Sequence, residues 1–211
     1  KSASGGHQKG GFDVVIANPP YLQLQKAFDD KRKYADLYKN TGFQTFERTG
    51  DIYALFYEKG LNILHNNGNL CFITSNKWMR ANYGKSLRKF LSNKNPLSLI
   101  DLGSGVFSTA TVDTNILLIE KTPRQSLKNR NLKKQDGLSA TTLTKDKPLD
   151  QLTENDFTIL TDLSEGSWII ILPEEQSIKQ KIEQIGTPLK DWDVKIYSGL
   201  LTGFNEAFII D

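Results

Sequence analysis

The residues of this chain best suited to chemistry are Asn18, Pro19, Pro20 and Tyr21, which follow a short apolar run over residues 12–17. Two consecutive prolines fix φ and offer no backbone N–H, so the Asn18 side-chain oxygen and the Pro19 carbonyl form a rigid pair of acceptors. Such a pair can bind both hydrogens of an exocyclic aromatic amine and bias its nitrogen towards a tetrahedral geometry with an exposed lone pair. Tyr21 would add a ring on which the aromatic base stacks. The simpler alternative is a strand-ending turn with a surface tyrosine.

The place of these residues in the chain favours the chemical interpretation. Residues 12–17 (FDVVIA) are apolar and branched, without helical period, and lie between a Gly-Gly pair and the two prolines, which predicts a buried strand. In open α/β sheets ligands bind beyond the carboxyl ends of the strands. A rigid polar turn at that end is therefore a candidate site.

The elements that must position this turn alternate along the chain. Apolar residues recur at helical spacing after Asp51, an expected N-cap, and Asn66-Asn67-Gly68 marks the expected end of that helix. Further strands are predicted over residues 70–74, 97–102 and 114–119, with a basic helix over 78–91 between the first two. Strand, helix, strand, helix, strand predicts an α/β protein with a mostly parallel sheet.

Charge is unevenly distributed. The whole chain has a net charge of only +3, yet residues 61–100 contain no Asp or Glu and six basic residues, five of them in the predicted helix or just before it. These five are Lys77, Arg80, Lys85, Arg88 and Lys89, which we regard as candidate phosphate contacts. Residues 121–149 are also rich in Lys and Arg. Concentrated basic segments favour a polyanionic partner, although solvated basic helices are a common alternative.

Composition excludes several classes of protein. The chain is 38% hydrophobic and 24% charged, which is typical of a globular protein. Its apolar runs are too short for a membrane helix, and no secretory signal is recognisable at the N-terminus. One cysteine and two distant histidines have no metal-ligand spacing, so neither a metal site nor a disulfide is expected. We expect a cytoplasmic protein without a metal.

The motifs in their order along the chain resemble those of a known enzyme family. FDVVIANPPY resembles the catalytic motif of S-adenosylmethionine-dependent amino-methyltransferases, particularly the DNA adenine-N6 methyltransferases. The segments DIYALFYEKGLNIL, NGNLCFITSNKWMRANYGKSLRKFL and DLGSGVFSTATVDTNILLIEK resemble the elements that follow in that family. IYSGLLTGFNEAFIID is similar to the entry to the target-recognition region of type IIG or IIS restriction-modification enzymes.

This resemblance implies a role for individual residues. Asn18, Pro19 and Pro20 match the catalytic turn that accepts the amine, with Asn18 also close to the cofactor, and Tyr21 matches its stacking ring. Phe107 matches the family's second stacking aromatic, with a surface loop residue as the alternative. Phe56 matches a residue that packs near the cofactor adenine, although an aromatic residue on an amphipathic helix is more often a core residue. The implied cofactor is S-adenosylmethionine, and the implied partner is double-stranded DNA with a flipped target base.

The resemblance also implies a division of the chain. Residues 1–122 would be the second half of a Rossmann-like methyltransferase sheet, residues 123–150 a basic linker or mobile loop, and residues 151–211 the start of a smaller α+β target-recognition region. The cofactor loop precedes the NPPY strand in the usual motif order, so we expect this fragment to bind the cofactor incompletely and to be inactive alone. Any DNA cleavage would reside in an endonuclease elsewhere in the full-length protein. The sequence predicts neither the oligomeric state nor the recognition sequence.

One glycine-rich segment imitates a cofactor loop. Residues 101–105 (DLGSG) resemble the turn that opens a nucleotide-binding sheet, but the β-branched residues after them lack helical period. A circularly permuted enzyme with its cofactor loop at this place is the alternative. Two other functions also stay open: an NPPY-type methyltransferase of RNA or of a protein glutamine, and a module that binds DNA or a partner without catalysis.

Overall fold

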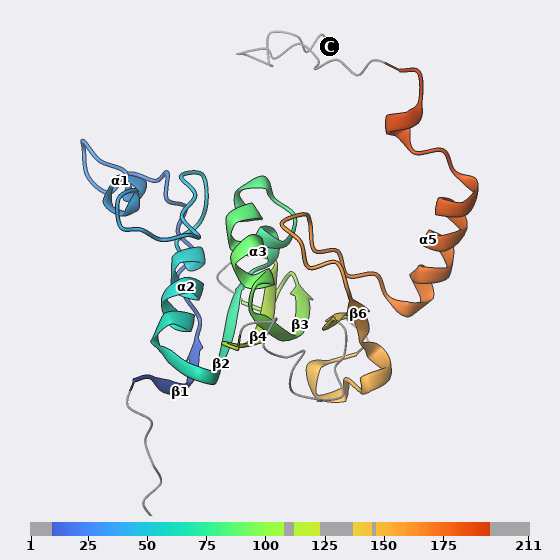
Figure 1. Ribbon diagram of the computed structural model, residues 1–211, viewed down its shortest axis with the longest axis horizontal. Coiled ribbons are helices and arrows are strands. Elements are labelled where there is room, and N and C mark those ends of the chain that lie inside the picture. Colours follow the sequence, from blue (N-terminus) through green and yellow to red (C-terminus); the bar gives the residue numbers. More distant parts are fainter. Residues whose placement is uncertain (1–9, 108–111, 123–136, 145–146, 195–211) are drawn as a thin grey trace, which may run out of the picture. The chain divides into compact units, whose positions relative to one another are not determined.

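A computed structural model describes residues 10–107, 112–122, 137–144 and 147–194. The chain divides into two compact units, Lys1–Pro173 and Glu174–Asp211. The first unit is a mixed α/β domain (Figure 1). No helix in the described residues is long and apolar enough to cross a bilayer.

A six-stranded sheet forms the first unit in the order β1-β2-β4-β3-β5-β6. Strands β1, β2, β3 and β5 run in one direction, while β4 and β6 run antiparallel to their neighbours. This arrangement confirms the predicted α/β class, but three of the five strand pairs in the described residues are antiparallel, so the sheet is mixed rather than mostly parallel. The bounds are β1 Phe12–Ala17, β2 Leu64–Ser75, β3 Asn95–Gly103, β4 Thr114–Glu120, β5 Leu138–Thr142 and β6 Thr158–Leu160.

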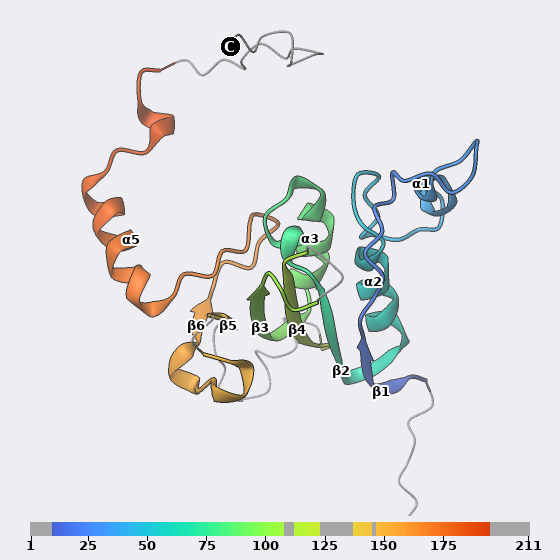
Figure 2. The same cartoon turned by 180° about the vertical axis from the view of Figure 1, so that it is seen from behind.

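Helices α2 (Tyr53–Ile63) and α3 (Lys85–Ser92) supply much of the core, and α2 lies alongside β1 and β2 in both views (Figures 1 and 2). Apolar residues of α2, α3 and the strands form one buried cluster, which includes Tyr57, Phe72, Trp78, Leu91 and Leu117. A second, smaller cluster joins the short helix α1 (Tyr34–Tyr38) to the start of α2.

The predicted basic helix is shorter than expected. Two 3₁₀ turns, Asn76–Met79 and Asn82–Gly84, precede α3. Gly84 lies so close to the first turn that a Cβ there would be 2.0 Å from the Trp78 carbonyl oxygen. The chain therefore folds back on itself at Gly84 instead of continuing one regular helix, and we call residues 76–84 the basic turn.

Strand β1 has the predicted bounds but is not buried. It is one of the two outer strands of the described sheet, and Phe12, Val14 and Ile16 are 62%, 54% and 75% exposed. Only Val15 and Ala17 pack against the core. The apolar composition predicted burial on both faces, whereas among the described residues one face of the strand has no cover.

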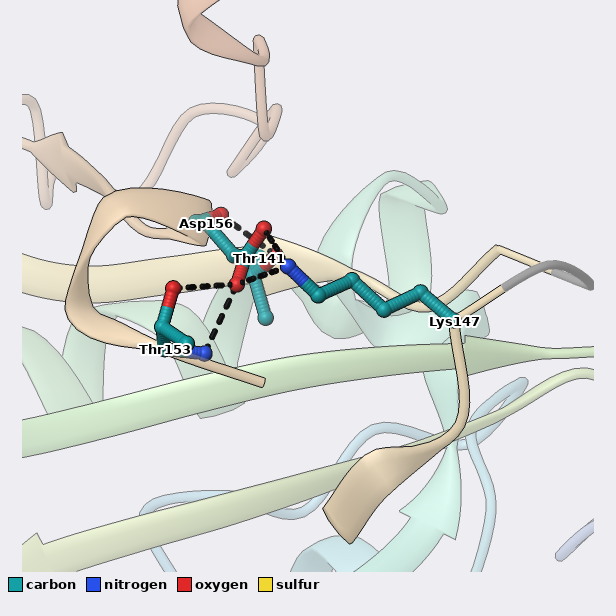
Figure 3. A network of polar contacts seen from close by, with 4 residues as sticks. All are labelled: Thr141, Lys147, Thr153 and Asp156. Carbon is teal, nitrogen blue, oxygen red and sulfur yellow. Dashed lines mark hydrogen bonds and ion pairs between the residues drawn. The ribbon is translucent and has the colours of Figure 1, made fainter. Parts of the chain in front are cut away.

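Strand β5 lies within the segment predicted as a linker, residues 123–150. It pairs parallel with β3 and antiparallel with β6. Hydrogen bonds of Asp156 join β5 to the segment that follows it (Figure 3). The Asp156 carboxylate accepts from Lys147 Nζ (2.5 Å) and from the Thr153 amide (2.7 Å). Thr141 Oγ1 in β5 donates to the Asp156 carbonyl. These bonds hold the pKa of Asp156 down at about 2. Residues 123–136 and 145–146 lie outside the described part.

The second unit begins at Glu174. The segment around Trp168 belongs to the first unit, where its amide donates to the Met79 carbonyl (2.8 Å) and its ring meets the Trp78 ring edge to face. The helical spacing of apolar residues after Pro173 predicts a helix over residues 174–185, and helix α5 (Pro173–Ile185) confirms it, with exposed apolar residues at Ile178, Ile182 and Ile185. Short strands predicted by the sequence at residues 194–197 and 207–210 fall almost wholly outside the described part.

Strand β1 is tied to β2 at its first residues by a histidine. His65 Nε2 lies 2.6 Å from Asp13 Oδ1, and this bond raises the pKa of His65, while the nearby Lys121 opposes the shift. Because the pKa is raised in the folded state, the pair stabilises the fold fully below about pH 6.5. That contribution disappears as the pH rises through the raised pKa.

We therefore predict that His65→Gln lowers the midpoint of thermal unfolding at pH 6 and leaves it unchanged at pH 9. Asp13→Asn should show the same pH dependence, because it removes the other member of the pair. A His65→Gln difference of equal size at both pH values, measured by circular dichroism, would contradict this account.

Candidate active site

The polar residues predicted to do chemistry lie at one edge of the sheet. Strands β1, β2 and β3 run parallel, so their carboxyl ends meet at that edge. The residues that follow these strands are 18–21, the basic turn, and 104–107. The fold therefore places three of the predicted groups of site residues at the position where α/β proteins bind ligands.

The NPPY turn, residues 18–21, leaves the sheet directly after Ala17. Asn18 is exposed, Pro19 is buried, and Tyr21 is half-buried. The Tyr21 hydroxyl donates a hydrogen bond to Asn18 Oδ1 (3.2 Å), and its ring lies edge to face with Tyr53, with 6.5 Å between centroids. Partial burial and the nearby Asp51 raise the pKa of Tyr21, so the phenol stays neutral. The turn thus offers an exposed amide oxygen next to a neutral aromatic ring.

Asp51, expected to be the N-cap of the helix, precedes the actual N-cap of α2, Ile52, and its carboxylate contacts the NPPY turn. Asp51 Oδ1 accepts a hydrogen bond from the Leu22 amide (2.8 Å), the first residue after the turn. The partners are 29 positions apart, so spacing along the chain gave no signal for this contact.

Phe56 lies on α2 between two buried residues, yet its own side chain is 40% exposed. It is therefore not the core residue that an amphipathic helix favours, and its ring is accessible to a ligand. Phe107 is half-buried at the end of the loop after β3, and residues 108–111 lie outside the described part. No ring contact joins Phe107 to Tyr21 in the described part of the chain.

Two of the five basic candidates line a pocket. A cavity of about 300 Å³ lies at the basic turn, bordered by Asn76, Lys77, Arg80, Ala81 and Asp113. Lys77 and Arg80 are exposed there.

A buried carboxylate supports the wall of this pocket. Asp101 is only 5% exposed and accepts hydrogen bonds from Asn76 Nδ2 (2.9 Å) and the Gly103 amide (3.1 Å). Arg80 Nη2 lies 3.6 Å from its other oxygen. Asp101 thus orients one polar and one cationic residue of the pocket.

The other three basic candidates have different surroundings. Arg88 is 4% exposed and donates to the carbonyls of Trp78, Ala81 and Glu165, so its guanidinium is a structural clamp inside the domain. Its buried donors are unsuited to a phosphate contact, a point that the charge pattern alone could not reveal. Lys85 pairs with Glu165 at the surface (3.0 Å), and Lys89 is exposed on α3.

The DLGSG segment does not open a helix. Asp101 and Leu102 belong to β3, Gly103 and Gly105 have φ of +65° and +82°, and the described residues up to Phe107 form no helix. The segment leads into β4, which runs antiparallel to β3. This geometry differs from a phosphate-binding turn under a helix N-terminus.

A buried polar chain behind the basic turn was not predicted. The Thr74 hydroxyl is 3.0 Å from the Tyr57 hydroxyl and donates to Asn115 Oδ1, which also accepts from Trp78 Nε1 (3.1 Å). Asn115 Nδ2 and the neighbouring Thr114 hydroxyl are buried without a partner. Through Trp78 this chain fixes the basic turn to the middle of the sheet. These polar residues lie far apart in the sequence among apolar residues, so the sequence gives no signal for the hydrogen bonds between them.

The described residues contain no group of three or more His, Cys, Asp or Glu side chains that could hold a metal ion. The residues gathered at the sheet edge are instead amide and carbonyl acceptors, tyrosine rings and basic side chains. Such a set is suited to an uncharged aromatic amine near a polyanion.

Comparison with known proteins identifies the family of the chain. Residues 2–107 match the model of the Eco57I restriction-modification methylase family, which is half of the chain. Among curated proteins, the chain is 37% identical to the type II restriction enzyme and methyltransferase RM.Eco57I of Escherichia coli over 52% of its own length. It is 28% identical to the type II methyltransferase M.PaeR7I of Pseudomonas aeruginosa over 96% of its length.

The chain spans 11% of RM.Eco57I and 36% of M.PaeR7I, well under two thirds of either relative. Among solved structures, a nuclease-deletion mutant of the type ISP restriction-modification enzyme LlaGI superposes with a TM-score of 0.54 and 20% identity. That match covers 75% of this chain and 15% of the larger one, and it shows a shared fold. By its family match, the chain belongs to the Eco57I restriction-modification methylases.

Proposed function

We propose that the full-length protein transfers a methyl group from S-adenosylmethionine to the N6 amine of adenine in a specific double-stranded DNA sequence, as part of a restriction-modification system. The observation that carries the proposal is the exposed Asn18 oxygen beside the Tyr21 ring at the carboxyl edge of β1. Membership of a restriction-modification methylase family and the methyltransferase names of the relatives support it.

The proposed chemistry uses the acceptors of the NPPY turn. The lone pair of an aromatic amine is delocalised into the ring, which makes the nitrogen a poor nucleophile. Hydrogen bonds from the amine to Asn18 Oδ1 and the Pro19 carbonyl favour a tetrahedral nitrogen whose lone pair points at the methyl carbon. The new N–C bond forms as the C–S bond breaks, S-adenosylhomocysteine leaves, and the extra proton on nitrogen passes to water.

The target base must leave the helix to reach this turn. We propose that it stacks on Tyr21, with Phe107 on its other face. In the free protein the Tyr21 hydroxyl donates to Asn18 Oδ1, so the entering amine replaces that hydroxyl as the hydrogen-bond donor. A neutral phenol with a raised pKa loses little when this exposed bond breaks.

The methyl donor requires more protein than this chain supplies. S-adenosylmethionine provides an electrophilic methyl on a sulfonium, and the exposed Phe56 ring together with Asn18 would border its site. The DLGSG segment lacks the helix of a cofactor loop. We propose that another part of the full-length protein continues the sheet beyond β1, covers Phe12, Val14 and Ile16, and completes the cofactor site. The 211-residue chain alone would then be inactive.

For the DNA we propose phosphate contacts from Lys77, Arg80, Lys85 and Lys89, which are exposed at or near the basic turn. Arg88 is left out because its donors are used by backbone carbonyls. We assign target recognition to the part of the chain from residue 151 onward and to regions beyond it.

The methyl-transfer proposal predicts that Asn18→Ala in the full-length protein lowers the rate of DNA methylation by about 10²-fold or more, the usual loss when one oriented polar contact to a transition state is removed. Transfer of labelled methyl groups to duplex DNA measures the rate. Asn40→Ala, at an exposed asparagine of the loop after α1, is the matched control and should keep the parental rate.

The same assay distinguishes the alternatives. RNA and a glutamine-containing protein substrate are tested beside DNA, and the methylated nucleoside is identified by mass spectrometry. Undiminished DNA methylation by Asn18→Ala would refute the role of Asn18. Methylation of RNA or of glutamine in preference to DNA would refute the substrate.

The phosphate proposal predicts that Lys77→Gln and Arg80→Gln each reduce the slope of log K against log salt concentration by about 0.9, because each removes one phosphate contact. The loss of affinity should be similar for specific and nonspecific sequences. Fluorescence anisotropy of labelled duplexes at several salt concentrations provides the slopes.

Lys94→Gln is the control, since Lys94 precedes β3 at the opposite edge of the sheet and lies over the Phe90 ring. It removes the same charge from the same basic segment. Equal slopes for all three variants and the parent would show that the basic turn does not contact the backbone of DNA.

A further inference from the structure

We infer that Asp51 is a positioning residue for methyl transfer: its carboxylate fixes the NPPY turn to the start of α2 and so sets where Asn18 and Tyr21 lie. This inference rests on the proposed function and adds a residue that contacts neither the base nor the methyl donor.

Hydrogen bonds hold the chain directly after the turn through both backbone groups of Leu22. The Leu22 amide donates to Asp51 Oδ1 (2.8 Å), and the Leu22 carbonyl accepts from the Ile52 amide (2.9 Å). Two residues later the Leu24 amide donates to the Gly50 carbonyl (2.9 Å). The strand-like segment after the turn is thereby paired antiparallel with the segment that enters α2.

This anchor matters because the turn has few donors of its own. Pro19 and Pro20 have no N–H, so neither can bond the turn to the sheet as a donor. Leu22, one residue beyond Tyr21, is where the chain is tied again. Without the Asp51 acceptor, the Leu22 amide would lose its partner. The chain after the turn would then keep the bonds of the Leu22 carbonyl and the Leu24 amide, but it would lose the side-chain bond nearest to Tyr21.

Asp51 also joins the turn to the surface on which Tyr21 packs. The Tyr21 ring meets the Tyr53 ring edge to face, and Tyr53 is the first residue of α2. The Tyr53 hydroxyl lies 3.4 Å from that of Tyr83 in the basic turn. The Asp51 contact therefore holds the NPPY turn near Tyr53, and Tyr53 in turn contacts both the Tyr21 ring and the basic turn that carries the proposed phosphate contacts.

The acceptor oxygen, rather than the charge, performs this role. Asp51 is half-buried, and burial raises its pKa, while hydrogen bonds from the Leu22, Ile52 and Tyr53 amides oppose that shift. An asparagine keeps one oxygen for the Leu22 amide, whereas an alanine keeps none. Displacements of about 1 Å in a reacting pair cost on the order of 10²-fold in rate, so a loosened turn should reduce turnover strongly.

The experiment compares Asp51→Ala and Asp51→Asn in the full-length protein. We expect Asp51→Ala to lower kcat by about 10- to 100-fold, with a smaller change in KM for DNA because the phosphate contacts persist. Asp51→Asn should recover most of this loss. Asp36→Ala is the matched control, since Asp36 also accepts a backbone hydrogen bond, from Lys33 (2.9 Å), but within the 23–50 segment and away from the turn.

A second readout does not depend on any activity. Hydrogen exchange of the Leu22 amide should be protected in the parent, Asp51→Asn and Asp36→Ala, and faster in Asp51→Ala. Fluorescence of 2-aminopurine at the target position reports whether the base still stacks on Tyr21, and thermal unfolding reports the folded fraction used to correct kcat.

The outcomes separate the inference from the proposed function. Parental kcat in folded Asp51→Ala with fast Leu22 exchange would overturn the positioning role. Unchanged exchange in Asp51→Ala would overturn the contact itself. Should Asp51→Ala not fold, a loss of kcat in Asp51→Asn with a protected Leu22 amide overturns the inference, and a parental kcat there supports it. Failure of the proposed function appears separately, as full methylation by Asn18→Ala.

Discussion

The close packing of α2 on β2 is the contact on which the candidate site depends. Gly60 makes it possible, because a Cβ at that position would lie 2.6 Å from Leu70 Cδ1 and 3.0 Å from Phe72 Cζ. At its first turn the same helix presents Tyr53 to the Tyr21 ring, and at its last turn it leads directly into β2, which ends at the basic turn. One helix therefore sets the distance between the NPPY turn and the pocket at the basic turn. A larger residue at 60 would move both.

Buried polar groups also position the basic turn, but they reduce the stability of the core. The Tyr57, Thr74, Asn115 and Trp78 chain crosses the core from α2 to the basic turn, and Asn115 Nδ2 stays without a partner. A buried polar atom without a hydrogen bond costs about 1–3 kcal/mol, so an apolar core would be more stable here. Apolar side chains, however, lack the directional bonds that orient the Trp78 ring. The unpaired polar atom therefore lowers the stability of the core, while the hydrogen bond to Trp78 fixes the basic turn.

The sequence predicted the features whose signal is local. The strand before Asn18, the helix after Asp51 and the strand over 114–119 have a clear period, and the structure contains all three. The helix ends earlier than expected, at Ile63, and the predicted stop at residues 66–68 lies within β2. Strand β5 was missed because LSATT is short and polar, and its partner β3 is some forty residues away. The exposure of β1 was missed because composition cannot tell an outer strand from a central one. The roles of Arg88 and Asp51 were also predicted wrongly, because their hydrogen-bond partners come from tertiary structure and leave no signal in the local sequence.

The residues proposed to bind the target base and those proposed to bind the methyl donor differ in how completely this chain surrounds them. Every contact that we identify around the acceptor turn comes from within the first unit: the Asn18 oxygen, the Tyr53 surface under Tyr21, and the Asp51 bond to Leu22. Strand β1 presents three exposed apolar side chains on the face opposite Val15 and Ala17, and helix α2 presents the exposed Phe56 ring. An outer strand with large exposed apolar side chains favours a covering element. In the proposed reaction, the residues assigned to the target base are therefore positioned by contacts within the first unit, whereas the residues assigned to the methyl donor lie next to an uncovered strand.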